Sequence, residues 1–134
     1  MAPLKLEIVT PEKRVIDDNV DSVTVPTLTG EAGILPNHAP LISALKPGIL
    51  SFTKKGTTEK LAVAGGFVEV SADKVSVMTD TAESSADIDV DAARAEKDAA
   101  EKALAAVASG SIEETADVRD RLEVAKVRLQ LAAR

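Results

Sequence analysis

The sequence predicts a β-sandwich of about ten antiparallel strands followed by a C-terminal antiparallel α-helical hairpin. Between residues 4 and 79, short apolar segments recur roughly every 8 to 12 residues, separated by Gly, Pro, Asn and Asp, as in all-β domains. From about Asp80 onward, glycine occurs once, at Gly110, proline is absent and alanine dominates. This change predicts an N-terminal β-sandwich domain over residues 1–86 and a helical hairpin over residues 87–134.

The strands are predicted from alternation of apolar and polar side chains. Leu4, Leu6 and Ile8 alternate with charged residues, which is the period of a half-buried strand. Further strands are expected over residues 14–17, 20–25, 41–45, 49–53, 60–64, 67–71 and 75–79. Pro47-Gly48 predicts a type II turn between two of them, because glycine accepts the positive φ that this turn requires.

The helices are predicted from capping signals and composition. Aspartates at positions where a helix begins accept hydrogen bonds from free N–H groups and meet the positive end of the helix dipole: Asp87, Asp89 and Asp91. Residues 91–108 are alanine-rich with interleaved Glu and Lys, all strong helix formers. Gly110 is expected to follow the end of this helix.

Ser111 and Glu114 have the spacing of a capping box, which predicts a second helix from residue 112 to about 133. The short link makes the two helices antiparallel neighbours. The first helix offers mostly methyl groups for packing, and each buried carbon contributes only about 0.8 kcal/mol. The hairpin should therefore be held weakly, and two interpretations stay open: a detachable arm, or a hairpin packed permanently on the sandwich.

Composition excludes several function classes. The net charge of −6 disfavours nucleic acid and adsorption to anionic lipid, and the only aromatic residues, Phe52 and Phe67, offer no stacking platform. No apolar run approaches the roughly 20 residues that span a bilayer. Without cysteine, and with the single histidine His38, we predict no metal site and no catalytic site, since no nucleophile motif or Walker loop is present.

The segment 30–41 is the most unusual stretch. Gly30 and Gly33 permit backbone angles closed to other residues, and Pro36 and Pro40 fix φ on either side of Asn37 and His38. We expect a stiff, exposed turn. Such a turn is either an ordinary connection between strands or a binding surface.

Three segments together make the chain resemble the ε subunit of F-type ATP synthases, whose mitochondrial counterpart is called δ. They are GEAGILPNHAPL at 30–41, VAGGFVEV at 63–70 and DIDV at 87–90. The resemblance covers the whole chain. It implies a non-catalytic central-stalk (rotor) subunit that links the γ subunit to the c-ring for proton-driven ATP synthesis.

The resemblance also implies where the partners bind. It assigns the contact with the c-ring and γ to one set of residues: Glu31, Gly33, Leu35, Pro36, Asn37, His38 and Pro40. The chain would be a peripheral membrane protein on the cytoplasmic face of a bacterial inner membrane, or on the equivalent organellar face, touching the membrane only through the complex. No nucleic acid partner is implied.

The resemblance also implies that the hairpin can be compact against the sandwich or extended along γ toward the catalytic α and β subunits, and that the extended form inhibits ATP hydrolysis. The second helix carries cations that would face acidic surfaces of those subunits: Arg119, Arg121, Lys126 and Arg128. The alternative is a solvated face in which these cations pair with carboxylates of the same helix.

Some bacterial members bind regulatory ATP through the pattern Ile or Leu, Asp, two variable residues, Arg, Ala. Residues 90–95 read Val-Asp-Ala-Ala-Arg-Ala, so the resemblance makes Asp91, Arg94 and Arg128 a possible ATP site. The alternative is that Asp91 caps a helix and Arg94 is a surface charge; no other cofactor is expected. An alternative function is a free-standing β-sandwich adaptor that binds a protein partner.

Overall fold

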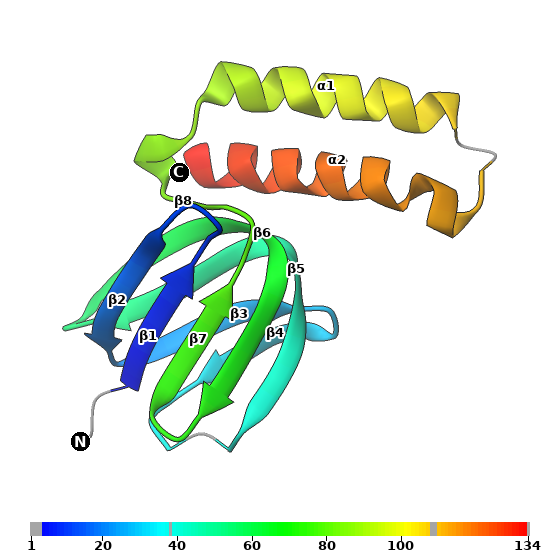
Figure 1. The fold of residues 1–134 in the computed structure, drawn as a ribbon. Helices are drawn as coiled ribbons and strands as arrows, with labels where there is room; N and C mark the ends of the chain where they lie inside the picture. Colours follow the sequence, from blue (N-terminus) through cyan, green and yellow to red (C-terminus); the bar gives the residue numbers. More distant parts are fainter. Residues whose placement is uncertain (1–3, 38, 108–109, 134) are drawn as a thin grey trace.

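The computed structural model describes residues 4–37, 39–107 and 110–133, and the side chain of Ile112 also lies outside the description. It contains a β domain followed by two long helices (Figure 1). The strands are β1 (Leu4–Val9), β2 (Arg14–Val20), β3 (Ser22–Thr27), β4 (Gly30–Ile34), β5 (Leu41–Lys54), β6 (Thr57–Ser71), β7 (Lys74–Met78) and β8 (Ala82–Glu83). The helices are the 3-10 helix η1 (Ser85–Asp87), α1 (Val90–Ala106) and α2 (Ile112–Ala132).

The eight strands form one continuous sheet that encloses a single core. Its order is β2-β1-β7-β6-β5-β3-β4, with β8 paired to β6. Side chains from both halves of this order meet in one cluster, for example Leu6 and Val75 with Val23 and Leu50, all of them at most 1% exposed. The sheet therefore folds over on itself into the predicted sandwich.

Strands β5 and β6 are long because the expected turn at Pro47-Gly48 does not form. β5 runs through both residues, and its pairing with β6 keeps one register, with Leu45 opposite Gly66 and Pro47 opposite Ala64. The type II turn was a wrong prediction, because the paired β6 offers Pro47 a place in the ladder. Each long strand supplies a segment to both layers, so the eight strands correspond to the roughly ten segments expected from the sequence.

Gly65 and Gly66 allow this bend. Their φ angles are +103° and +113°, which side chains rarely adopt. A Cβ placed on Gly66 would lie 1.9 Å from the carbonyl oxygen of Met78. The backbones of β6 and β7 thus approach so closely that only glycine fits.

All strand pairs are antiparallel except β1 and β7, which run parallel, with Leu6 opposite Val75. The prediction of a wholly antiparallel sheet is wrong for this pair. Parallel neighbours need a long crossover connection, and strands β2 to β6 together provide it.

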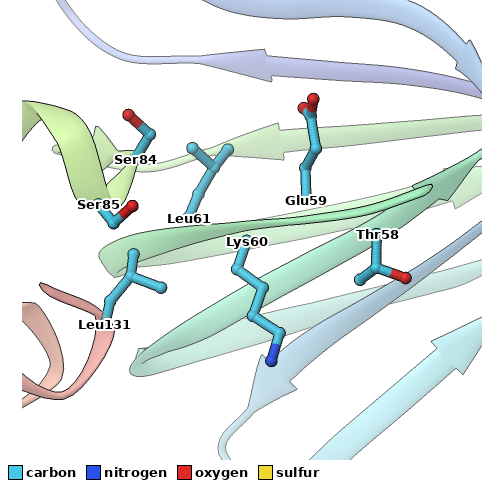
Figure 2. A pocket seen from close by; sticks show the side chains of 7 residues that line it. All are labelled: Thr58, Glu59, Lys60, Leu61, Ser84, Ser85 and Leu131. Carbon is cyan, nitrogen blue, oxygen red and sulfur yellow. The ribbon is translucent and has the colours of Figure 1, made fainter. Parts of the chain in front are cut away.

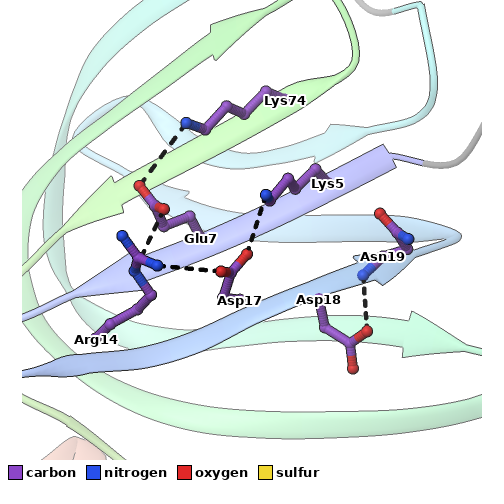
Figure 3. Close-up of polar contacts among 7 residues, drawn as sticks. All are labelled: Lys5, Glu7, Arg14, Asp17, Asp18, Asn19 and Lys74. Carbon is purple, nitrogen blue, oxygen red and sulfur yellow. Dashed lines mark hydrogen bonds and ion pairs between the residues drawn. The ribbon is translucent and has the colours of Figure 1, made fainter.

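The edge strand β2 is tied to its neighbours by ion pairs (Figure 3). Asp17 lies 3.2 Å from Arg14 and 3.3 Å from Lys5, while Glu7 lies 3.5 Å from Arg14 and 3.9 Å from Lys74. Pairs as exposed as these contribute at most about 1 kcal/mol each. Their charges also make this edge a poor template for pairing with another chain.

Asp18 on the same strand accepts hydrogen bonds from the Lys54 ammonium and, at 2.8 Å, from the backbone N–H of Asn19. These two contacts hold the pKa of the Asp18 carboxyl below its ordinary value. Because the folded state favours the ionised carboxyl, the contribution to stability is present above the ordinary pKa of an aspartate. It is lost as the pH falls through the lowered pKa.

The helical hairpin forms with the predicted caps. The Ser111 hydroxyl accepts from the Glu114 N–H, and the Glu114 carboxylate accepts from the Ser111 N–H, which completes the capping box. At α1 the cap is Asp89, whose carboxylate accepts from the Ala92 N–H at 3.0 Å. The first helix ends at Ala106 with Val107 as its C-cap, so Gly110 does not directly follow the end of the helix as predicted.

The hairpin packs on the sandwich mainly through α2. Val127 and Leu131 contact Ala62 of β6, and Ile49 of β5 packs against the same cluster. The α1 helix rests on α2 through Ala93 and Ala100, both fully buried. The hairpin is docked in this structure, and its detachment stays a prediction.

Replacing Gly66 with alanine tests the close approach of β6 and β7. We expect Gly66→Ala to lower the free energy of unfolding by about 3 kcal/mol, because positive φ and a backbone clash act together. Gly33→Ala is the matched control, since its Cβ would meet nothing within 4 Å and we expect a change within about 0.5 kcal/mol. Urea unfolding measures both, and equal stability of the two variants would contradict the assigned role of Gly66.

Candidate interaction surfaces

The predicted turn at 30–41 divides into an edge strand and a short loop. Gly30–Ile34 forms β4, paired with β3, so the prediction of a turn is wrong for these five residues. Ile34 is buried in the core, whereas Glu31 and Gly33 on this strand are exposed. Pairing with β3, which the residues of the segment itself do not reveal, makes this glycine-containing segment a strand.

The loop that follows lies at the end of the sandwich opposite the helices (Figure 1). We call the described residues of this loop, 35–37, 39 and 40, the tip loop. Leu35, Asn37 and Pro40 are exposed and Pro36 is half-buried, while His38 lies outside the described residues. The predicted interface residues that the structure describes therefore lie on β4 and on the tip loop that follows it.

The structure has a second candidate surface, which could not be recognised from the sequence. Val9 lies opposite Met78, Met78 opposite Phe67, and Phe67 opposite Ala44, across β1, β7, β6 and β5. These residues alternate with the core residues of their strands, so their side chains face outward. Phe67 and Met78 are 56% and 53% exposed.

Two further exposed residues extend this row. The Leu28 N–H donates to the Ala44 carbonyl at 3.2 Å, and Ile42 lies two residues before Ala44 on β5. Leu28 is 68% and Ile42 73% exposed. We call the set the open apolar face: Val9, Leu28, Ile42, Ala44, Phe67 and Met78.

A hollow of about 500 Å³ lies within the open apolar face. Val9, Phe67 and Met78 line it, together with Gly66 and with neighbouring residues of the β1 and β7 ends: Thr10, Pro11, Thr79 and Asp80. Large exposed apolar residues gathered around a hollow are typical of a protein-binding surface. The sequence signal was present in Phe67, one of only two aromatic residues, but its neighbours come from distant strands.

The cations of α2 all have partners inside the chain. Arg121 contacts Glu96 of α1 at 2.8 Å, Lys126 lies 3.7 Å from Glu123, and the Arg119 Nε donates to the Thr115 hydroxyl at 3.1 Å. Lys126 pairs with a carboxylate of the same helix, as the alternative expected, whereas Arg121 reaches α1, so the role of the cations stays a prediction.

Arg128 joins α2 to the sandwich. Its Nε lies 2.8 Å from one carboxylate oxygen of Glu83 on β8, and its Nη2 donates to the other at 3.3 Å. The angle at Nε is not that of a hydrogen bond, so this contact is an ion pair. Both side chains are only about a quarter exposed or less, so water screens this pair less than the others.

The three possible ATP-binding residues are Asp91, Arg94 and Arg128. Among the described residues, no contact joins these three side chains into one site. Asp91 and Arg94 are exposed on the first turns of α1, whereas Arg128 is engaged with Glu83. Another hollow, of about 450 Å³, lies beside the end of α2 (Figure 2). Thr58, Lys60, Ser84 and Leu131 are among its lining residues, and none of the three candidates lines it.

Within the described ranges, no group of three or more His, Cys, Asp or Glu side chains could hold a metal ion. Neither helix there is long and apolar enough to cross a membrane. The structure is a β-sandwich that carries the open apolar face, the tip loop and a docked helical hairpin. These features define a class of protein that acts by contacting other proteins.

The comparisons with known proteins identify the family. The model of the ATP synthase delta/epsilon chain β-sandwich domain matches residues 3–85. The chain is 42% identical over 135 aligned positions to the ATP synthase epsilon chain of Geotalea uraniireducens, covering 98% of this chain and 94% of the relative. It is 48% identical over 99 residues to the epsilon chain of Desulfitobacterium hafniense strain Y51, covering 74% and 75%.

Comparison with solved structures leads to the same family. A chain in the Euglena gracilis mitochondrial ATP synthase, OSCP/F1/c-ring, matches with a TM-score of 0.79 at 25% identity, over 100% of this chain and 83% of that one. A chain in the central stalk/c-ring of the Tetrahymena thermophila enzyme shares the fold, with a TM-score of 0.64 at 15% identity over 96% of both chains. This chain belongs to the ATP synthase delta/epsilon family, and the epsilon chain is a non-catalytic subunit of that complex.

A double-mutant cycle on Glu83 and Arg128 tests how strongly α2 is fixed to the sandwich. We expect Glu83→Gln and Arg128→Gln each to destabilise docking and the coupling energy to be about 1 to 2 kcal/mol, since the pair is partly buried. Hydrogen exchange of the α2 amides in the wild type, the two single variants and the double variant measures this coupling energy. The control cycle is Glu96 with Arg121, a more exposed pair for which we expect less than about 0.5 kcal/mol. Equal coupling in the two cycles would contradict a special role for Arg128.

Proposed function

We propose that this chain is a central-stalk rotor subunit that links γ to the c-ring in proton-driven ATP synthesis. The observation that carries the proposal is the open apolar face, which the docked hairpin leaves uncovered. Family membership gives the complex in which that face is used. The likeness to a chain of an assembly that contains F1 and the c-ring supports the same partners.

We assign the open apolar face to γ. Covering exposed residues such as Ile42, Phe67 and Met78 removes apolar surface from water, which contributes roughly 25 cal/mol for each Å². The hollow between Val9, Phe67 and Met78 has room for a large apolar side chain of the partner. Such a central, desolvated anchor supplies much of the binding energy in a protein interface.

We assign the tip loop and the exposed residues of β4 to the c-ring. The tip loop lies at the end of the sandwich opposite the hairpin, so a partner bound there would not compete with α2 (Figure 1). Glu31 is exposed, and among the described residues its side chain makes no hydrogen bond or ion pair, while its backbone pairs with β3. Its carboxylate is therefore free to meet a polar loop of the ring.

The hairpin is proposed to restrain ATP hydrolysis by extending toward the catalytic subunits. Extension exposes Val127, Leu131 and Ala62, and it separates Arg128 from Glu83. The cations Arg119, Arg121, Lys126 and Arg128 would then exchange internal partners for acidic surfaces of α and β. The docked structure is the resting form from which that exchange begins.

The proposed location follows from the complex. The chain would be peripheral to the membrane, on the cytoplasmic face of a bacterial inner membrane or the equivalent organellar face, and held there by γ and the c-ring. A free-standing adaptor is the alternative function. Co-purification of γ with this chain supports the rotor subunit, whereas a monomer that does not bind γ would support the adaptor.

Placing a charge in the open apolar face tests the γ assignment. We expect Phe67→Glu to weaken binding to γ at least about 30-fold, because a carboxylate would be buried in the centre of the interface. Val90→Glu is the control, since Val90 is 39% exposed on the hairpin and we expect no change. Isothermal titration of γ with each chain measures this, and tight binding by Phe67→Glu would remove the assignment.

Regulatory ATP is proposed only as a ligand that competes with Glu83 for Arg128. ATP binding at Asp91, Arg94 and Arg128 must break the contact between Arg128 and Glu83, so we expect Glu83→Gln to bind ATP more tightly than the wild type. Arg94→Gln should bind more weakly. Calorimetric titration of the full chain measures both, and the absence of heat at millimolar ATP in every variant would exclude an ATP site.

A further inference from the structure

We propose that Asp73, on the turn between β6 and β7, positions the tip loop, and that the surface facing the c-ring combines both segments. The inference rests on the proposed function for its partner. It adds a second chain segment, distant in sequence, to the surface that segment 30–41 was expected to form alone.

A single hydrogen bond joins the two segments. The backbone N–H of Asn37 donates to Oδ1 of Asp73 at 3.1 Å, across 36 residues of sequence. Asp73 is half-buried, while Asn37 is exposed. A carboxylate that accepts from a backbone N–H forms one of the stronger classes of hydrogen bond, and here it fixes the middle of the tip loop.

Both segments have unusual backbone conformations where they meet. Only three non-glycine residues in the described chain have positive φ, and two are Asn37, at +66°, and Ala72, at +52°. Asparagine tolerates this region, but alanine does so only with strain. Ala72 immediately precedes Asp73, so the strained turn is the one that carries the acceptor. Strain of this kind is maintained where a particular geometry is needed.

The two segments also border one hollow. A depression of about 420 Å³ is lined by Pro40 and Ile42 from the tip loop and the start of β5, and by Glu69 and Ser71 from the end of β6. A partner that covers the tip loop from this side therefore also meets the strand leading into the β6–β7 turn. Leu35, 63% exposed, lies two residues before Asn37 in the tip loop and adds apolar surface to this end of the molecule.

Asp73 has a backbone role that side-chain substitution leaves intact. Its carbonyl oxygen accepts from the Lys5 N–H at 2.7 Å, which closes the β1–β7 pairing at this end. Changing the carboxylate therefore alters the contact with the tip loop without removing this hydrogen bond. This separation makes the side chain testable as a positioning residue.

The first measurement is the amide exchange rate of Asn37 in the full chain. We expect Asp73→Ala to raise this rate about tenfold, because the acceptor is lost. Asp73→Asn keeps an oxygen acceptor and should change the rate less than about threefold. Thermal unfolding shows that each variant folds, and Asp73→Ser, whose oxygen is on a shorter side chain, replaces Asp73→Ala if that variant does not.

The second measurement is binding of the complex between γ and this chain to purified c-rings. We expect Asp73→Ala to weaken binding about tenfold, Asp73→Asn to restore it, and Asp98→Ala, which removes an exposed carboxylate on α1, to have no effect. Unchanged Asn37 exchange in Asp73→Ala overturns the positioning role. Raised exchange with unchanged c-ring binding overturns the combined surface while the proposed function stands. If the wild-type complex does not bind c-rings, the proposed function fails and the combined surface with it.

Discussion

The bend of β5 and β6 is the constraint on which the rest of the structure depends. Because Gly65 and Gly66 adopt positive φ, β6 continues from one layer of the sandwich into the other without a turn. The carbonyl of Met78 occupies the space that a side chain at position 66 would need. One sheet can therefore enclose the core from both sides, and it has two outward faces with different surroundings.

The two outward faces are used differently because the hairpin covers only one. Ile49 and Ala62, which alternate with core residues of β5 and β6, pack against Val127 and Leu131 of α2. The outward residues of the other layer include Phe67 and Met78, which nothing in the described chain covers. The docked hairpin and the open apolar face therefore occupy separate surfaces of the sandwich, and the hairpin leaves the open apolar face accessible to a partner.

Patterns within a few neighbouring residues were enough to predict some strands and the start of the second long helix. The alternation of Leu4, Leu6 and Ile8 gave β1, and the spacing of Ser111 and Glu114 gave the start of α2. Pro47-Gly48 misled because a turn signal cannot show that a partner strand is already in place. The segment 30–34 was misjudged for the same reason, since its pairing with β3 depends on residues outside the motif.

The candidate surfaces could be predicted only in part. The tip loop was found through its prolines and through the resemblance to a family, both visible in the sequence. The open apolar face depends on register: Val9 and Met78 are neighbours only because β1 pairs in parallel with β7, a contact between distant strands. Asp73 was missed because its hydrogen bond to Asn37 has no sequence signature.

Hydroxyl-radical footprinting of the chain, free and assembled with γ and the c-ring, tests most directly which face the partners cover. The account predicts that oxidation of Phe67, Met78 and Ile42 falls strongly on assembly, while oxidation of Val90 on the hairpin changes little when α2 is docked. Unchanged oxidation of Phe67 and Met78 in the assembled complex would contradict it.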